Sequence, residues 1–465
     1  MPQRVTRGLA ASAFLLAAVT AAATGGAFRS TRHGDPDTGV QRLAGEPRGE
    51  CSQCHDQHAS REGAPTGGPF PYLLFAANDN ALCATCHDAA GRFDVYPGTA
   101  PWSASTHAVS PIVVWPGPDP PGRPAADAGK CVNCHDAHGT KDADGVVPSM
   151  AAVREEGLCL GCHDGSPAPD VRTPFLRAFA HPVSASGRHD AGEGGDPARF
   201  AGGSRHAECA DCHNPHRGSA DRVPPAPPAA SNRLVGVSRV KVTNGPAATR
   251  PVYTWAGPAE TGFAAEYEVC FKCHCSWTTQ PVGQSDLALL LNPNNPSFHP
   301  VEQTGRNRNI DPFAFANGWT WDRLVYCSDC HGSDDPSVRG PHGSTYRHLL
   351  RKDYAATTAA APMAPTDLCF DCHSWDTYAS DRAPDASAAA SRFNPPGESR
   401  GHAYHVGRRE LSCYACHQSH GSTQRPALIA TGRTPGLAGY TQSATGGSCT
   451  PTCHRAVTYT VNYPR

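Results

Sequence analysis

The residues with the clearest chemistry in this chain are paired cysteines that are each followed by a histidine. Nine copies of Cys-x-x-Cys-His are present, and a tenth copy, Cys449-Thr-Pro-Thr-Cys453-His454, contains one extra residue. A chain of this composition contains about 0.05 such motifs by chance, so the repetition reflects chemistry. The spacing is typical of covalent haem attachment, in which two thiols form thioethers with the vinyl groups and the histidine becomes the proximal ligand of the iron.

The motifs predict ten covalently bound haem c groups, each with its iron, and the extra residue of the last motif sets the tenth site apart. The predicted thioether residues are Cys51, Cys54, Cys83, Cys86, Cys131, Cys134, Cys159, Cys162, Cys209, Cys212, Cys270, Cys273, Cys327, Cys330, Cys369, Cys372, Cys413, Cys416, Cys449 and Cys453. The predicted proximal ligands are His55, His87, His135, His163, His213, His274, His331, His373, His417 and His454.

Two other uses of paired cysteines are alternatives to haem. Disulfide bonds and zinc sites both employ them, but neither requires a histidine after every second cysteine. The one cysteine outside the motifs, Cys275, is either a reactive thiol or an inert buried side chain.

Further histidines recur around the motifs and predict the distal ligands. One group follows a proximal histidine by three residues or lies in a later Gly-Pro-His-Gly segment, and the other lies upstream of each motif pair. A histidine three residues along lies on the same side of a helical turn as the proximal one, so we expect it to bind the iron of a neighbouring haem. The predicted distal ligands are His33, His58, His107, His138, His181, His216, His299, His342, His405 and His420.

Two points about the distal ligands stay open. An upstream histidine could serve the motif pair ahead of it or the one behind, and His206 or His402 is an alternative to His33. Beyond the initiator, only Met150 and Met363 are present. Because an axial methionine raises the haem potential, mostly bis-histidine, low-spin and low-potential haems are expected.

The N-terminus predicts export. Arg4 and Arg7 precede an Ala-rich apolar run, which is typical of a cleaved signal peptide over residues 1–27; an uncleaved anchor is the alternative. The run is shorter than the roughly 20 residues of a membrane span, so no span is expected in the mature chain. The formal net charge of −2 gives no basic footprint for nucleic acid.

The composition predicts that haems form much of the core. Gly and Pro number 46 and 44, and hydrophobic residues make up only 39% of the chain. About 44 mature residues accompany each haem, which is near the lower size limit for independent folding. The predicted fold is a multihaem cytochrome c with mostly irregular loops and short α-helices around a haem-packed core.

The motifs divide the mature chain into five predicted haem-pair repeats, at residues 28–100, 101–175, 176–293, 294–396 and 397–465. One small β-hairpin is predicted as an insertion in the third repeat. Residues Leu234 to Val242 alternate between apolar and polar types, Asn244-Gly245 is a turn signal, and Pro251 to Trp255 can return as the second strand.

The chain resembles the multihaem c-type cytochromes with doubled CxxCH motifs, which are abundant in metal-reducing and other anaerobically respiring proteobacteria. The resemblance rests on the five paired motifs, Cys131-Val-Asn-Cys-His-Asp-Ala-His138-Gly, Phe298-His299-Pro300-Val301 and Gly340-Pro-His-Gly-Ser344. It implies electron transfer in the periplasm or at the cell exterior, with redox proteins such as other cytochromes as partners. Some of these related cytochromes pass electrons to extracellular metal oxides, and some polymerise into filaments.

The residues favour an electron-transfer conduit over an enzyme. A multihaem oxidoreductase acting on nitrite, hydroxylamine or a sulfur oxyanion is the alternative, and it needs one iron with an open distal position. The spare histidines are numerous enough to fill every distal position, and no motif replaces the proximal histidine. A subunit of an extracellular filament, which would also conduct electrons, is a further alternative.

Overall fold

A computed structural model describes residues 27–56, 70–87, 102–111, 129–184, 206–221, 223–260, 262–278, 284–355, 358–394 and 401–464. The predicted signal peptide, except for its last residue, and His58 lie outside the described residues. The chain forms two compact units, Met1–Ala168 with Pro215–Ser219, and Pro169–Asn214 with Ala220–Arg465. The division into five repeats stays a prediction.

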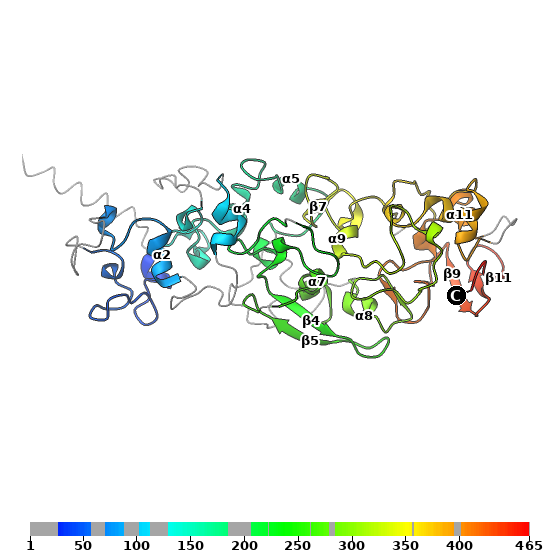
Figure 1. The fold of residues 1–465 in the computed structure, drawn as a ribbon, viewed down its shortest axis with the longest axis horizontal. Helices are drawn as coiled ribbons and strands as arrows, with labels where there is room; N and C mark the ends of the chain where they lie inside the picture. Colours follow the sequence, from blue (N-terminus) through cyan, green and yellow to red (C-terminus); the bar gives the residue numbers. More distant parts are fainter. Residues whose placement is uncertain are drawn as a thin grey trace, which may run out of the picture. The chain divides into compact units, whose positions relative to one another are not determined.

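The helices are short, and irregular connections dominate the ribbon (Figure 1). The α-helices are α2 (Asn80–His87), α3 (Thr106–Val109), α4 (Glu155–Leu160), α5 (Arg172–Phe175), α6 (Cys209–Cys212), α7 (Glu266–His274), α8 (Leu287–Leu291), α9 (Cys327–Cys330), α10 (Trp375–Tyr378) and α11 (Asp385–Ala390). Within the described residues, no helix is long and apolar enough to cross a membrane.

Single 3₁₀ turns supply most of the remaining helical structure. They are η1 (Phe28–Ser30), η2 (Cys51–Gln53), η3 (Pro71–Leu73), η4 (Trp102–Ala104), η5 (Cys131–Asn133), η6 (Pro148–Met150), η8 (Asn232–Leu234), η9 (Pro312–Ala314), η10 (Arg347–Leu349), η11 (Leu368–Asp371) and η13 (Cys413–Ala415), and η12 (Tyr404–Arg408) is a π turn.

The strands form small antiparallel sheets. The strands are β1 (Lys141–Asp142), β2 (Gly145–Val146), β3 (Phe179–Ala180), β4 (Arg239–Thr243), β5 (Val252–Ala256), β6 (Ser297–Phe298), β7 (Gly343–Ser344), β8 (Gly421–Ser422), β9 (Leu437–Gln442), β10 (Gly446–Pro451) and β11 (Val457–Thr460). They pair as β1-β2, β3-β7, β4-β5, β6-β8 and β11-β10-β9.

The predicted β-hairpin is confirmed, and a second β region was missed. Strands β4 and β5 pair from Arg239 with Ala256 to Thr243 with Val252, and residues 244–251 connect them. The turn lies beyond Asn244-Gly245, where the N–H of Thr249 donates to the Pro246 carbonyl at 3.2 Å. The prediction of a single hairpin is wrong because β9, β10 and β11 form a three-stranded sheet near the C-terminus. This segment is rich in Gly, Ser and Thr, so it carries little of the apolar alternation that signals a strand.

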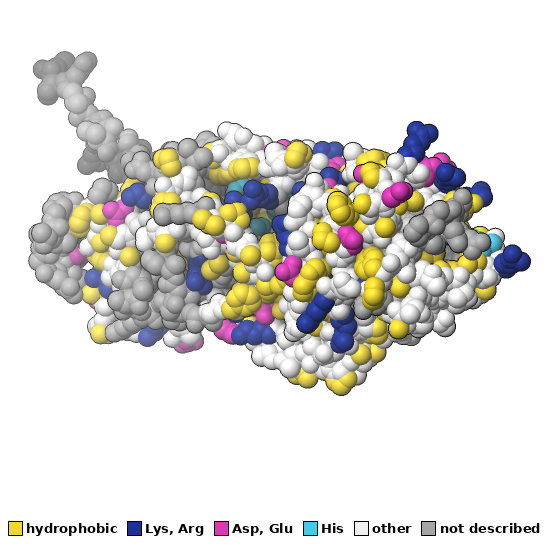
Figure 2. Space-filling view, turned by 45° about the vertical axis from the view of Figure 1, so that its right-hand side comes forward, with side chains coloured by type: hydrophobic (Ala, Val, Ile, Leu, Met, Phe, Trp, Pro, Cys, Tyr) yellow, Lys and Arg dark blue, Asp and Glu magenta, His cyan; other side chains and the backbone are white. Residues whose placement is uncertain are grey.

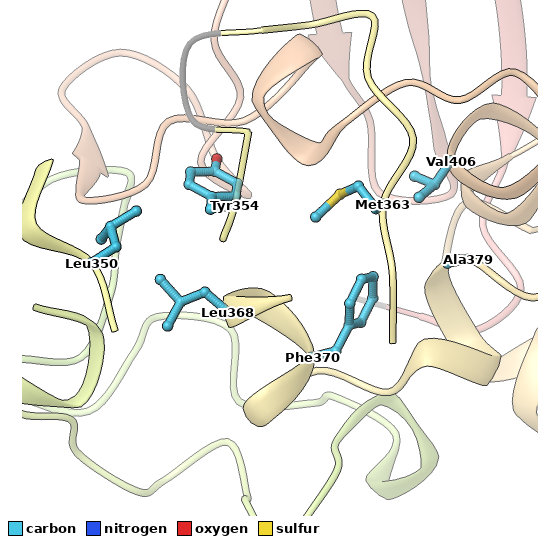
Figure 3. Packing of buried hydrophobic residues seen from close by; sticks show 7 residues of the cluster. All are labelled: Leu350, Tyr354, Met363, Leu368, Phe370, Ala379 and Val406. Carbon is cyan, nitrogen blue, oxygen red and sulfur yellow. The ribbon is translucent and has the colours of Figure 1, made fainter. Parts of the chain in front are cut away.

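Buried hydrophobic side chains gather in small clusters that contact motif cysteines. One cluster contains Leu350, Tyr354, Met363, Leu368, Phe370, Ala379 and Val406, with Cys369 and Cys413 packed against it (Figure 3). Another contains Phe271, Cys275, Ala288, Leu291 and Val301, with Cys327 at its edge. The apolar packing of these clusters therefore surrounds the residues that are predicted to attach haem.

Candidate haem-binding sites

The nine regularly spaced motifs fold as short helical turns. In the motif at Cys327, the backbone N–H of His331 donates to the Cys327 carbonyl at 2.9 Å. The Asp329 carboxylate accepts from the N–H of Tyr326 at 2.8 Å, which caps the turn. Residues three and four positions apart project on the same side of such a turn, so both thiols and the imidazole can face one porphyrin.

The tenth motif has a different backbone. Cys449 lies in β10, whose last residue is Pro451, and Cys453 and His454 follow the strand. The expectation of a short helix at every motif is therefore wrong here. The longer spacing between Cys449 and Cys453 thus coincides with extended backbone in place of a helical turn.

Every motif histidine faces a second histidine across a similar gap. Both rings of each pair belong to the same unit. The pairs, with distances between ring centres, are His55 with His138 (6.0 Å), His87 with His33 (5.9 Å), His135 with His216 (5.8 Å), His163 with His107 (6.2 Å), His213 with His342 (6.1 Å), His274 with His181 (6.3 Å), His331 with His420 (6.0 Å), His373 with His299 (6.5 Å), His417 with His402 (6.0 Å) and His454 with His405 (6.2 Å).

These gaps fit a haem iron. A metal ion binds an imidazole nitrogen at about 2 Å, and the centre of the ring lies about 1 Å behind that nitrogen, so two axial imidazoles on one iron have centres roughly 6 Å apart. All ten distances lie between 5.8 and 6.5 Å. Within the described residues, no group of three or more His, Cys, Asp or Glu side chains could hold a metal ion, so the donor sets do not resemble closed zinc sites.

The partner of each motif histidine follows a simple order. The first motif histidine of a predicted repeat faces a histidine of the next repeat, as His135 faces His216. The second motif histidine faces the upstream histidine of its own repeat, as His163 faces His107. In the fifth predicted repeat the first motif histidine, His417, instead faces His402 of the same repeat.

Backbone carbonyls orient many of these rings. Among the proximal histidines, Nδ1 of His55 lies 2.8 Å from the carbonyl of Tyr72, and that of His331 lies 2.9 Å from the carbonyl of His348. An Nδ1–H that donates to a carbonyl leaves the Nε2 lone pair available to a metal and fixes the plane of the ring.

An upstream histidine is oriented by a backbone carbonyl that directly precedes another distal histidine. Nδ1 of His181 lies 2.7 Å from the carbonyl of Pro341, the residue before His342. Strands β3 and β7 pair directly beside this contact, and β6 and β8 pair in the same way beside His299 and His420. One short backbone ladder thus positions ligands for two haem sites.

Burial keeps the imidazoles of His216, His402 and His420 neutral. Few histidines reach the face drawn in Figure 2. Burial lowers the pKa of His420 and of His402 to about 3, and that of His216 to about 4, with smaller contributions from neighbouring histidines. A neutral imidazole is the form that ligates a metal.

Motif cysteines from successive predicted repeats also meet. The Cys270 thiol lies close to that of Cys327, and each affects the ionisation of the other; the equivalent pairs are Cys83 with Cys131 and Cys369 with Cys413. Each pair joins the second motif of one repeat to the first motif of the next. Haems attached at such a pair would therefore have their thioether edges next to each other.

Sequence reasoning underrated His402 and missed a recurring turn. His402 resembles the distal histidines in its surroundings, because the upstream His405 binds the carbonyl of Gly401 at 2.7 Å and Phe393 contacts the His402 ring edge-on.

The recurring turn has two successive residues with positive φ, and one of its carbonyls binds a proximal histidine. It occurs at Tyr72-Leu73, Ser149-Met150, His348-Leu349 and Ala427-Leu428. A Pro or Arg before the pair and an apolar residue after it are the available sequence signals.

A scan against protein families finds the doubled CXXCH motif three times, at residues 47–92, 123–168 and 323–377. The chain is a multihaem c-type cytochrome. The matches cover the first, second and fourth predicted motif pairs and confirm the resemblance drawn from the sequence. Comparisons with curated proteins and with solved structures give no match.

Haem in this cytochrome is bound covalently through its CXXCH motifs and carries iron, and the iron performs one-electron exchange. Multihaem cytochromes pass electrons to other redox proteins. The number of haems and the individual ligands of this cytochrome stay predictions, and His58 lies outside the described residues.

As the one cysteine outside the motifs, Cys275 gives a reference for an alkylation test of how many motif cysteines carry haem. Its side chain is fully buried, Sγ donates to the carbonyl of Phe271 at 3.0 Å, and burial raises the pKa of the thiol to about 11. We expect no alkylation of the native holoprotein and one alkylated cysteine per chain in denaturant, measured by intact mass. The Cys275→Ser variant should take no label in either condition. Labelling of the native protein would show that Cys275 is reactive, and extra labels in denaturant would show that motif cysteines lack haem.

Proposed function

We propose that this cytochrome is an exported decahaem electron conduit in which two histidines hold every iron. The observation that carries the proposal is the set of ten facing histidine pairs with gaps of 5.8 to 6.5 Å. The assignment uses nine of the ten predicted distal histidines, with His402 in place of His58. An iron with both axial positions filled exchanges electrons without binding a substrate.

The contacts between motifs support conduction along the chain. Successive repeats are joined at Cys270 and Cys327 and at Cys369 and Cys413. Within the fifth repeat, burial raises the pKa of Cys416 to about 11 and the nearby Cys449 adds to this rise, so the two motifs of that repeat are close as well. Haems attached at these neighbouring motifs would lie close together, which suits electron hopping. The order of the motifs in the chain would fix the order of the haems.

The histidine ligands favour a low potential. Met363 lies in a hydrophobic cluster, where its Sδ is 3.4 Å from Sγ of Cys413, and Met150 lies in one of the left-handed turns. Bis-histidine ligation without an axial methionine suits anaerobic or extracellular respiration with weak oxidants. The signal-like N-terminus supports a location in the periplasm or at the cell exterior. The proposed partners are other cytochromes or metal oxides.

Low-temperature EPR of the oxidised holoprotein, quantified against total haem, tests this proposal. We expect a wholly low-spin signal. It should contain two classes, because the imidazole planes are nearly parallel at His135 and His216 (8°) and perpendicular at His163 and His107 (90°). A high-spin component near one haem in ten would contradict the conduit. It would favour the alternative, a reductase of nitrite, hydroxylamine or a sulfur oxyanion.

A further inference from the structure

A buried carboxyl group outside the haem ligands has an incomplete hydrogen-bond arrangement. Asn244 Nδ2 donates to Glu302 Oε2 at 2.6 Å. The other oxygen of each group, Asn244 Oδ1 and Glu302 Oε1, is buried and has no hydrogen-bond partner. Both oxygens are acceptors when the carboxyl group is ionised, so they cannot pair with each other.

One proton would satisfy both atoms. A protonated Glu302 could donate from Oε1 to Asn244 Oδ1, while Asn244 Nδ2 continues to donate to Oε2. An amide and a carboxylic acid that lie side by side form this double hydrogen bond, and a carboxylate cannot. Leaving two buried acceptors unpaired costs free energy, so the geometry favours the acid form of Glu302.

The surroundings of Glu302 raise the pKa of its carboxyl group toward neutral pH. Burial raises its pKa to about 7; the hydrogen bond from Asn244 opposes this rise, and the charge of Glu268 adds to it. The nearby positive charges are already engaged, since Arg239 pairs with Glu268 at 3.1 Å and Lys241 pairs with Glu260. Of the ionisable groups on α7, Tyr267 and Glu268 interact electrostatically with Glu302. The helix also carries Glu266, Cys270, Lys272, Cys273 and His274, and β4 carries Arg239 and Lys241.

Glu302 also lies close to two haem-binding segments. It follows the axial candidate His299 by three residues. The preceding residue, Val301, packs with Phe271 of α7, the helix that carries Cys270 and His274. The Glu302 segment therefore carries one candidate axial ligand and packs on the helix that carries another, so the carboxyl group lies where the charge of a nearby iron can act on it.

We propose that Glu302, held by Asn244 at the tip of the β4-β5 hairpin, is a proton-binding site coupled to reduction of the neighbouring haems. When a donor cytochrome or a chemical reductant gives one electron to a nearby ferric iron, the iron becomes ferrous and loses one positive charge. The Glu302 carboxylate then takes one proton from water, and oxidation of the iron releases it. The proposal rests on haem attachment and is independent of the conduit role.

Redox titration of the holoprotein at several pH values tests this site, with Glu302→Gln as the variant. Glutamine keeps the shape and can still pair with Asn244 through its amide, but it cannot titrate. In the wild type we expect the midpoint potentials of the nearby haems to fall as pH rises from about 6 to about 8. In Glu302→Gln this fall should be reduced for those haems. The Glu260→Gln variant keeps the Glu302 carboxyl group and should retain the fall, with a midpoint at lower pH because Lys241 loses its partner.

Infrared difference spectra between the oxidised and reduced protein identify the protonated group directly. We expect a carboxylic-acid C=O band to appear on reduction of the wild type and of Glu260→Gln, and to be absent in Glu302→Gln. Glu302→Asp should retain a band at a shifted position, which separates loss of the proton site from altered packing. An unchanged band and an unchanged pH dependence in Glu302→Gln would overturn the proposal and assign the proton to another group, such as a haem propionate. Both measurements are made at equilibrium, so failure of the conduit role would not affect them.

Discussion

Replacing His402 by alanine is expected to convert the haem attached at Cys413 and Cys416 from low-spin to high-spin and to leave the other haems unchanged. The ring of His402 is buried and lies 6.0 Å from that of His417, with 24° between the planes. Its Nδ1 is 2.7 Å from Ser391 Oγ, which orients Nε2 toward His417. Removal of the ring should therefore leave one iron with an open position.

EPR and magnetic circular dichroism would measure this change as one high-spin haem in ten, and carbon monoxide should bind to that fraction. His348→Asn is the matched control. The exposed side chain of His348 belongs to none of the ten facing histidine pairs, although it lies near enough to His331 to interact electrostatically with it. The carbonyl of His348, which binds His331, is unchanged by the substitution. Asparagine also tolerates the positive φ of this position. A wholly low-spin His402→Ala variant would mean that another residue ligates the iron at His417.

Production of the chain without haem attachment is expected to give a largely unfolded polypeptide. The hydrophobic clusters are small, and their packing ends on motif cysteines such as Cys369, Cys413 and Cys327. Without porphyrin these side chains lose their largest apolar partner, and buried histidines such as His299 lose the metal that would compensate their desolvation. The expected effect is loss of the cooperative fold rather than a small shift in stability.

Near-ultraviolet circular dichroism and limited proteolysis would compare this apoprotein with holoprotein made from the same gene in cells with the haem-attachment machinery. The apoprotein should lack near-ultraviolet signals and be digested rapidly throughout. A protease-resistant apoprotein with sharp tertiary signals would show that the polypeptide carries its own core.

Features encoded within a few residues were predictable from the sequence. The thioether cysteines and proximal histidines are defined by one short motif, and the hairpin by Asn244-Gly245 between alternating strands. The choice of distal partner was not predictable in this way, because His135 and His216 are far apart in the chain and meet only after folding. The left-handed turns were hidden because residues such as Tyr72 and Leu73 rarely adopt positive φ.

The order of the histidine pairs has a consequence for how such chains can change length. In the proposed ligation the first haem of each of the first four repeats takes its second imidazole from the repeat that follows, so such a repeat would not be a self-sufficient module. A chain cut after any of the first four repeats would end in one iron that still awaits a ligand and is open to small molecules. In the fifth repeat His402 fills the corresponding position from within the repeat itself.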